Sequence, residues 1–227
     1  MRVVRAGDPV NPNLLLILGR GNRVRHDHVR WLVEQFPDYR VHAVEIPDNG
    51  TDFERDYLNP IEEYAAGLEG YELLSHSTGG LVAAHMETDR PRVYLSPWWG
   101  LAERTAWLTE RVANLPIATP LLPSGIDADD IGPEMDPAVE ERPVAPAFLG
   151  TVKRAQETLP PFRDDATVFC SLADSVVSTG AIGERAPAER VRLYDGGHEP
   201  FAAEARAEIL ADVRAALADP EWITGST

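Results

Sequence analysis

The chain has 227 residues, enough for one domain with a substantial core. Apolar residues make up 44% and charged residues 26%, which is typical of a globular protein. Acidic residues outnumber basic ones 37 to 21, and the formal net charge of -16 argues against binding to nucleic acid or anionic membrane surfaces. The single cysteine, Cys170, excludes an internal disulfide and a cysteine-based zinc site.

The acidity has two interpretations. The chain is an ordinary acidic protein, or it is adapted to high salt, where a carboxylate-rich surface stays hydrated while counterions screen its self-repulsion. Lys153 is the only lysine, and arginine supplies the rest of the basic residues. That bias fits salt adaptation, although a GC-rich genome produces it too. We expect a salt-loving source.

Targeting signals are not evident. The longest early apolar run, residues 14–18, is too short for the core of a signal peptide or for a membrane span. We therefore expect a cytoplasmic protein with no membrane span.

Short apolar, β-rich runs alternate with amphipathic stretches, which predicts an α/β fold with a mostly parallel sheet and helices on both faces. Strands are expected at residues 14–18, 39–46, 71–74, 92–95, 167–171 and 190–194. Helices are expected around 29–36, from Pro60 to Gly67, from Gly80 to Met86 and over about 201–217. The sheet should have about six or seven strands.

The segment from about residue 97 to 165 interrupts this alternation. It holds many of the nineteen prolines and an acidic stretch at 126–142. Roughly seventy residues between consecutive core strands far exceed an ordinary connection. We therefore expect one domain over residues 1–227 with an inserted cap at about 97–165, the alternative for this segment being a disordered linker.

The most informative motif is Ser-His-Ser-Thr-Gly-Gly at residues 75–80. A short apolar strand precedes it and an apolar helix follows. Such a turn lifts Ser77 above the sheet edge, beside a helix N-terminus whose free amides favour negative charge. Small residues are needed at Ser75 and Gly79 because strand and helix approach closely there. Alone, this turn is also compatible with an ordinary helix start capped by a serine.

Two further residues give the turn a chemical context. A serine hydroxyl is a weak nucleophile and needs a base, itself oriented by a carboxylate. Asp174 lies just past the expected strand 167–171, and His198 just past the strand 190–194. Ser77, Asp174 and His198 therefore all follow parallel strands, at the sheet edge where open α/β sheets bind ligands.

The order Ser, Asp, His and the motif Gly-Gly-His-Glu-Pro-Phe at 196–201 make the chain resemble the α/β-hydrolase superfamily over nearly its whole length. The resemblance implies Ser77 as nucleophile, His198 as base and Asp174 as the orienting acid. It also implies an oxyanion hole formed by the backbone N–H groups of Thr78 and Arg20, with Gly21 as the less favoured alternative to Arg20. The chain departs from the family pattern at Ser75, where glycine is more usual, and at Leu18, where many relatives have histidine.

Other histidines near these motifs are expected to have structural roles. His76 adjoins the nucleophile, but neighbours on a sharp turn point apart, so we expect a packed residue. His26 and His28 lack metal-ligand spacing with nearby Cys, Asp or Glu, which favours helix-start or surface roles. Cys170 ends a core strand and is expected to be a buried thiol.

The acidic residues beside His198 are also assigned. Asp195 could orient His198, but Asp-Gly-Gly is strong turn chemistry, so a turn role is favoured. Glu199 is a candidate cap for the last helix, with Pro200 in its first turn.

Candidate pocket residues are Gly21, Trp98 and Trp99. The tryptophans follow the fourth expected strand at the edge that carries the triad, where they would form an apolar substrate pocket or anchor the cap to the core. The Arg20 side chain either holds a substrate carboxylate or lies in solvent.

The favoured function is a serine hydrolase that cleaves carboxylic esters through an acyl-enzyme, with no cofactor and no metal. The expected partner is a small-molecule ester. A thioesterase, lactonase or carbon–carbon bond hydrolase would use the same triad, and a non-catalytic receptor would have the same fold.

Overall fold

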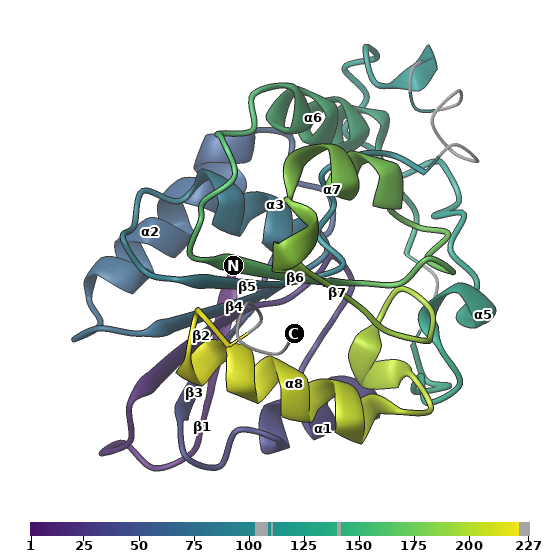
Figure 1. The fold of residues 1–227 in the computed structure, drawn as a ribbon. Coiled ribbons are helices and arrows are strands. Elements are labelled where there is room, and N and C mark those ends of the chain that lie inside the picture. The colour runs from purple at the N-terminus through teal and green to yellow at the C-terminus, as the bar shows by residue number, and fades with distance from the viewer. Residues whose placement is uncertain (103–108, 110, 140–141, 223–227) are drawn as a thin grey trace.

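The computed structural model describes residues 1–102, 109, 111–139 and 142–222. Its centre is a seven-stranded sheet in the order β1-β3-β2-β4-β5-β6-β7. β1 pairs antiparallel with β3, and the other pairs are parallel (Figure 1). The strands are β1 (Arg2–Ala6), β2 (Asn13–Ile17), β3 (Arg40–Glu45), β4 (Glu72–His76), β5 (Arg92–Leu95), β6 (Ala166–Cys170) and β7 (Val191–Leu193).

All six expected strands are present, each displaced by no more than two residues, and the mostly parallel sheet is confirmed. The strand absent from our prediction is β1. Its burial is only partial, and arginines interrupt its apolar residues, so the alternation that marks a buried strand is weak. An antiparallel edge strand of this kind is held by pairing with its neighbour rather than by burial.

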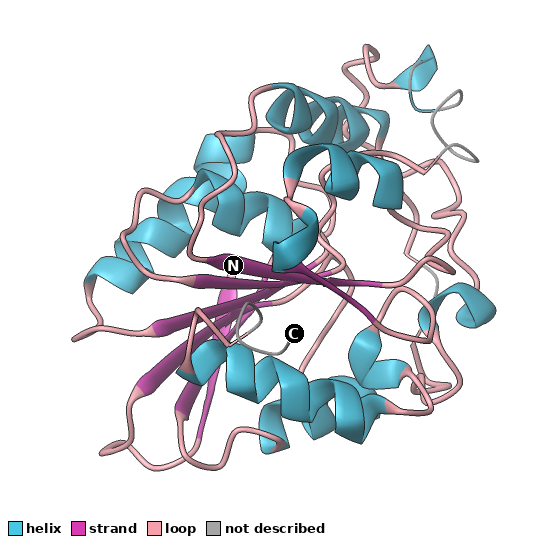
Figure 2. Ribbon diagram, viewed as in Figure 1, coloured by secondary structure: helices cyan, strands magenta, loops and turns pink. Residues whose placement is uncertain are grey.

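Two helical layers cover the sheet (Figures 1 and 2). One face carries α2 (Asn59–Ala66), α3 (Thr78–His85), α6 (Pro146–Glu157) and α7 (Thr179–Arg185). The other carries α1 (Asp27–Glu34) and α8 (Arg206–Ala218). Successive residues of β2 alternate between the two cores, with Leu15 and Ile17 in the first and Leu14 and Leu16 in the second. Because every side chain of such a strand is buried, the strand is a continuous apolar run.

Several helix boundaries differ from the sequence prediction. A π-helical turn, Glu54–Leu58, precedes α2, and α7 was not predicted. The last helix begins at Arg206, not near 201, because residues Pro200–Ala202 form a separate 3₁₀ turn. Phe201 in that turn is fully buried and stacks on His28, so this turn packs into the core before the helix starts.

The long connection between β5 and β6 is divided between two places. α6 packs Phe148, Val152 and Ala155 into the same core as α2 and α3. The short helix α5 (Ala128–Ile131) lies instead beyond the carboxyl ends of the strands (Figure 1). The interpretation of residues 97–165 as an inserted cap stays a prediction. Among the described residues, no helix combines the length and apolar character needed to cross a membrane.

Candidate active site

The turn between β4 and α3 holds Ser77 in a strained conformation. Its backbone has φ 51° and ψ -119°, a positive φ that non-glycine residues rarely adopt. Four backbone hydrogen bonds fix it. The Ser77 N–H donates to Leu95 O at 3.0 Å, and Ser77 O accepts from the N–H groups of Gly80 at 2.9 Å, Trp98 at 3.0 Å and Leu81 at 3.2 Å. Neighbouring strands therefore impose the turn and direct the serine hydroxyl out from the sheet edge.

The glycines after Ser77 allow α3 to approach the sheet. A Cβ on Gly79 would lie 2.3 Å from the carbonyl oxygen of Ile17 in β2. One on Gly80 would lie 2.8 Å from Cβ of Pro97. The requirement for a small residue at 79 is thus a backbone contact, and the atypical Ser75 is accommodated because its side chain is fully buried beneath the turn.

Ser77, His198 and Asp174 form a continuous line of hydrogen bonds. His198 Nε2 lies 2.9 Å from Ser77 Oγ, and His198 Nδ1 lies 2.8 Å from Asp174 Oδ2. Each residue follows a different strand, β4, β7 and β6, at the carboxyl edge of the sheet. All three side chains are buried, and that of Asp174 is 0% exposed.

The charges in this line are strongly coupled. Burial opposes ionisation of Asp174, but His198 and the backbone N–H groups of Val176 and Val177, at 2.9 and 3.1 Å, lower its pKa to about 2. Burial likewise opposes protonation of His198, but Asp174 raises the pKa of His198 above its ordinary value. Asp174 therefore accepts a hydrogen bond from the Nδ1–H of His198, which leaves Nε2 facing the serine hydroxyl as an acceptor.

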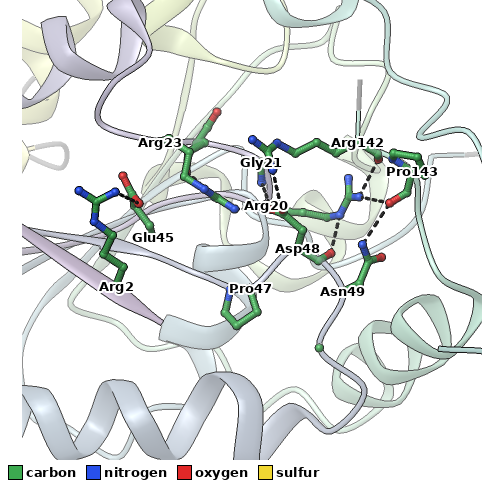
Figure 3. Close-up of polar contacts among 12 residues, drawn as sticks. Arg2, Arg20, Gly21, Arg23, Glu45, Pro47, Asp48, Asn49, Arg142 and Pro143 are labelled. Atoms are coloured by element: carbon green, nitrogen blue, oxygen red, sulfur yellow. Dashed lines mark hydrogen bonds and ion pairs between the residues drawn. The ribbon is translucent and has the colours of Figure 1, made fainter. Parts of the chain in front are cut away.

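The loop after β2 is anchored by Asp48 (Figure 3). The Gly21 N–H donates to Asp48 Oδ1 at 3.1 Å, and Arg23 and Arg142 bind the same carboxylate at 2.6 and 2.7 Å. Burial alone would raise the pKa of Asp48, but these two guanidinium groups hold it below its usual range. The Gly21 amide is thereby occupied by Asp48.

The Arg20 side chain is turned to the protein rather than to solvent. Its Nε donates to Asp48 O at 2.7 Å, and its Nη2 donates to the carbonyl oxygens of Arg142 and Pro143 at 2.7 and 2.8 Å (Figure 3). The guanidinium also lies 5.5 Å from the ring centre of Phe148. The surface interpretation of Arg20 is wrong, because these contacts make it a tie between the loop after β2 and the chain that enters α6.

Two backbone amides near Ser77, those of Arg20 and Thr78, are free to bind a substrate oxygen. Within the described part of the chain, the N–H groups of Arg20 and Thr78 donate to no other protein group. The loop that carries Arg20 packs directly on the nucleophile turn, since a Cβ on Gly19 would lie 3.0 Å from Cβ of Ser77. The geometry thus favours Arg20 over Gly21 as the partner of Thr78 at this position.

A cavity of about 170 Å³ opens at Ser77 and His198. Most of its other walls are apolar, and its larger side chains are Trp98, Leu101, Leu122, Ile126, Ile131, Val144, Phe148, Leu149 and Val176. Three buried polar atoms in this lining have no hydrogen-bond partner among the described residues: Trp98 Nε1, Thr78 Oγ1 and Glu199 Oε2. The arrangement can accept a mainly apolar group beside the serine hydroxyl.

The other two candidate pocket residues lie elsewhere. Trp99 is 5% exposed and packs edge-on against Tyr94 and Phe162, with its Nε1 3.4 Å from Gly80 O. It anchors the connection to the core and does not line the cavity at Ser77. Gly21 lines a neighbouring cavity of about 280 Å³ that shares the walls at Arg20 and Glu199.

His76 and Cys170 behave as structural groups. His76 is buried, and burial together with His198 lowers its pKa to about 3, so its ring is neutral. The Cys170 thiol is buried, and burial raises its pKa to about 11, so it is not a reactive thiolate. No group of three or more His, Cys, Asp or Glu side chains suited to a metal ion occurs in the ranges that the structure describes.

Three residues that the sequence placed at helix starts or on the surface have buried side chains. His26 is the N-cap residue of α1 and His28 lies in its first turn, as the helix-start alternative expected, but they are 3% and 1% exposed, so the surface alternative is wrong for both. Glu199 is 4% exposed and makes no capping hydrogen bond, and its carboxylate faces Asn22 and His28 instead. Only the position of Glu199 directly after His198 signalled its involvement.

Comparison with known proteins places the architecture. No family profile and no curated protein sequence matches the chain. Its structure is similar to monoglyceride lipase from Saccharomyces cerevisiae, with 14% identity and a TM-score of 0.72 over 97% of this chain and 89% of that one. It is also similar to a structure of the metagenome-derived lipolytic enzymes LipS and LipT, with 18% identity and a TM-score of 0.69 over 95% of this chain and 96% of that one. A third similar structure is carboxylesterase CesB from Bacillus subtilis, with 14% identity and a TM-score of 0.59 over 96% of this chain and 87% of that one. The chain has the α/β-hydrolase fold.

Proposed function

We propose that this protein is a serine hydrolase that cleaves carboxylic esters, with Ser77 as nucleophile, His198 as general base and Asp174 as the acid that orients it. The observation that carries the proposal is the unbroken hydrogen-bonded line from Ser77 through His198 to Asp174, at a strained turn that opens into an apolar cavity. The lipases and carboxylesterases of similar structure support ester chemistry.

Acylation begins at Ser77. Its Oγ attacks the acyl carbon of the ester while His198 Nε2 takes the hydroxyl proton. Ionised Asp174, bound to His198 Nδ1, stabilises the imidazolium that forms. The same proton is then donated to the alcohol oxygen as the acyl–oxygen bond breaks, so the alcohol leaves neutral and an acyl-enzyme remains on Ser77.

The oxyanion is placed between two amides. As the carbonyl carbon becomes tetrahedral, its oxygen takes a negative charge and accepts hydrogen bonds that the N–H groups of Arg20 and Thr78 donate. Each such donor contributes about 3 kcal/mol to lowering the barrier. Thr78 opens α3, so the amides at that helix N-terminus also favour the negative charge.

Deacylation repeats these steps with water. His198 Nε2 removes a proton from a water molecule, the resulting hydroxide attacks the acyl carbon, and the proton returns to Ser77 Oγ as the acid leaves. The cycle consumes one water and one ester and releases one alcohol and one carboxylic acid. It needs no cofactor or metal in this scheme.

The substrate class follows from the cavity. Its larger lining side chains are apolar, and the one arginine in the lining, Arg20, is committed to three backbone carbonyls. A chain with a net charge of -16 also disfavours anionic ligands. We therefore assign an uncharged ester with an apolar acyl group as the substrate.

We further propose that the enzyme is one domain over residues 1–227, with residues 97–165 as its cap. We place it in the cytoplasm of a salt-adapted organism.

A panel of 4-nitrophenyl esters of increasing acyl length tests the proposal. We expect hydrolysis by the wild-type protein, a preference among acyl lengths, and loss of turnover in Ser77→Ala. Matched thioesters and lactones measure whether esters are preferred. The proposal is contradicted if the folded protein hydrolyses no ester, or if Ser77→Ala retains wild-type turnover.

A further inference from the structure

Glu199 is a buried carboxylate that the mechanism above does not use. It directly follows His198, and its side chain is within the core of the site rather than at the surface. Burying an isolated charge is costly unless hydrogen bonds and opposite charges compensate it. The groups around its two oxygens therefore indicate what this charge does.

Each oxygen of Glu199 faces a different segment. Asn22 Nδ2, in the loop after β2, donates to Glu199 Oε1 at 2.9 Å. His28 Nε2, in α1, lies 3.1 Å from Glu199 Oε2. This is an ion-pair distance only: within the described residues, Oε2 has no hydrogen-bond partner.

The protonation of His28 is fixed by its other nitrogen. The backbone N–H of Asp136 donates to His28 Nδ1 at 3.1 Å, so the ring proton is on Nε2 and points toward Glu199. Burial alone would raise the pKa of Glu199, but His28 and Asn22 hold it below its ordinary value. Glu199 is thus an ionised carboxylate, with a hydrogen bond from Asn22 on one oxygen and the His28 ring beside the other.

Asn22 connects this charge to the oxyanion loop. The Asn22 N–H donates to Gly19 O at 3.2 Å, which closes the turn that contains Arg20. Asn22 Nδ2 also lies 3.3 Å from Nδ1 of His76, the residue before the nucleophile. Glu199 therefore holds, through one amide, the turn that carries the Arg20 N–H against the turn that carries Ser77.

The backbone at His198 and Glu199 is fixed by α5. The His198 N–H donates to Asp130 O at 2.7 Å, and the Glu199 N–H donates to Ile131 O at 3.2 Å. These are carbonyls of the last turn of α5, which have no partner within their own helix. A segment far from His198 in the sequence thereby sets the position of the base.

Three carboxylates raise the pKa of His198 against the effect of burial. Asp174 binds its ring directly, Glu199 adjoins it in the chain, and Asp130 lies in α5, where its carboxylate accepts hydrogen bonds from Ser175 Oγ and the Asp127 N–H. The ring of His76, which is neutral, lies 4.9 Å away between centres. The Tyr194 hydroxyl donates to His198 O at 3.2 Å. Glu199 is therefore the second buried negative charge near a base that must become positive during the reaction.

We propose that Glu199 is a positioning residue: through Asn22 it fixes the loop that carries the Arg20 amide, and its charge stabilises the protonated form of His198. This inference rests on the proposed ester hydrolysis, in which His198 accepts the proton of Ser77. Glu199 itself transfers no proton and touches no reacting atom.

The test compares Glu199→Gln, which keeps the size but removes the charge, with Glu199→Asp, which keeps the charge on a shorter side chain. Asp195→Asn is the matched control, because it removes an exposed carboxylate three residues before His198. The readouts are kcat and kcat/KM against pH with a 4-nitrophenyl ester, and an NMR titration of the His198 ring. Near-UV circular dichroism checks that each variant is folded.

We expect Glu199→Gln to lower kcat at least tenfold with little change in KM. Because loss of a neighbouring negative charge lowers the pKa of His198, the acidic limb of kcat/KM should also move down by about 0.5 pH unit or more. In Glu199→Asp the limb should stay in place while kcat falls. Because solvent screens the exposed carboxylate of Asp195, Asp195→Asn should have the kcat of the wild type and an acidic limb at the same pH.

A Glu199→Gln variant that is folded, with wild-type kcat and an unmoved limb, overturns the inference. Should that variant not fold, Asn22→Ala decides: lower kcat with an unmoved limb supports the tie to the oxyanion loop, and wild-type kcat overturns it. Complete inactivity of the wild type toward esters would refute the proposed function, and the NMR titration would still test the effect of the Glu199 charge on His198.

Discussion

Replacing Asp174 by asparagine is a quantitative test of the hydrogen-bonded line from Ser77 through His198 to Asp174. The change keeps the size of the side chain and removes a charge that is 0% exposed. The pKa of Asp174 falls from its ordinary 3.8 to about 2 in the folded protein. At 1.36 kcal/mol per pKa unit, this corresponds to roughly 2 kcal/mol of net favourable interaction with the ionised form, to which His198 makes the largest contribution.

The protonated His198 of the transition state loses that interaction in Asp174→Asn. A loss of roughly 2 kcal/mol corresponds to a rate about 30-fold lower. The asparagine amide can also donate to His198 Nδ1, which would place the ring proton on Nε2 and remove the acceptor for the Ser77 proton. We therefore expect kcat to fall at least about 30-fold, measured with a 4-nitrophenyl ester under saturating conditions.

Asp195→Asn is the control, since Asp195 is the other acidic residue close before His198 and is exposed. We expect a change in kcat of less than twofold. If Asp195→Asn costs more rate than Asp174→Asn in folded proteins, the assignment of the orienting acid is refuted.

Two further predictions concern stability. Gly79→Ala should lower the free energy of unfolding by about 1–3 kcal/mol, because its Cβ would lie 2.3 Å from Ile17 O. Gly183→Ala in α7, where a Cβ meets nothing within 4 Å, should raise it by up to about 1 kcal/mol. Equal effects in denaturant titrations would contradict this reasoning. The thermal midpoint should rise in molar KCl because counterions screen the net charge of -16, and an unchanged midpoint would count against salt adaptation.

The positions of the strands along the chain follow from local sequence signals. Runs such as Leu14–Ile17 are buried on both faces, so their apolar character is continuous and easily recognised. β1 lacks this signal because Arg2 and Arg5 flank its two valines and the strand is only partly buried at an edge of the sheet. The start of α8 was misplaced because the burial of Phe201 depends on contacts with His28 and His76, which are distant in the sequence.

The site was predictable where each residue follows its own strand. Ser77, Asp174 and His198 come directly after β4, β6 and β7, so their convergence at one sheet edge needs only the parallel topology. The support around them was not predictable. Asn22 and Glu199 are far apart in the sequence, and the carbonyls of α5 that hold His198 carry no side-chain signature.

The most direct measurement of the central claim is labelling with a fluorophosphonate, which phosphonylates an activated serine, followed by mass spectrometry of the modified peptide. The experiment is run in molar KCl and in low salt, on the wild type and on Ser77→Ala. We expect one modification, on Ser77, that is absent from Ser77→Ala. Failure of the folded wild-type protein to react in either salt, or labelling that persists in Ser77→Ala, would contradict the assignment of Ser77 as the nucleophile.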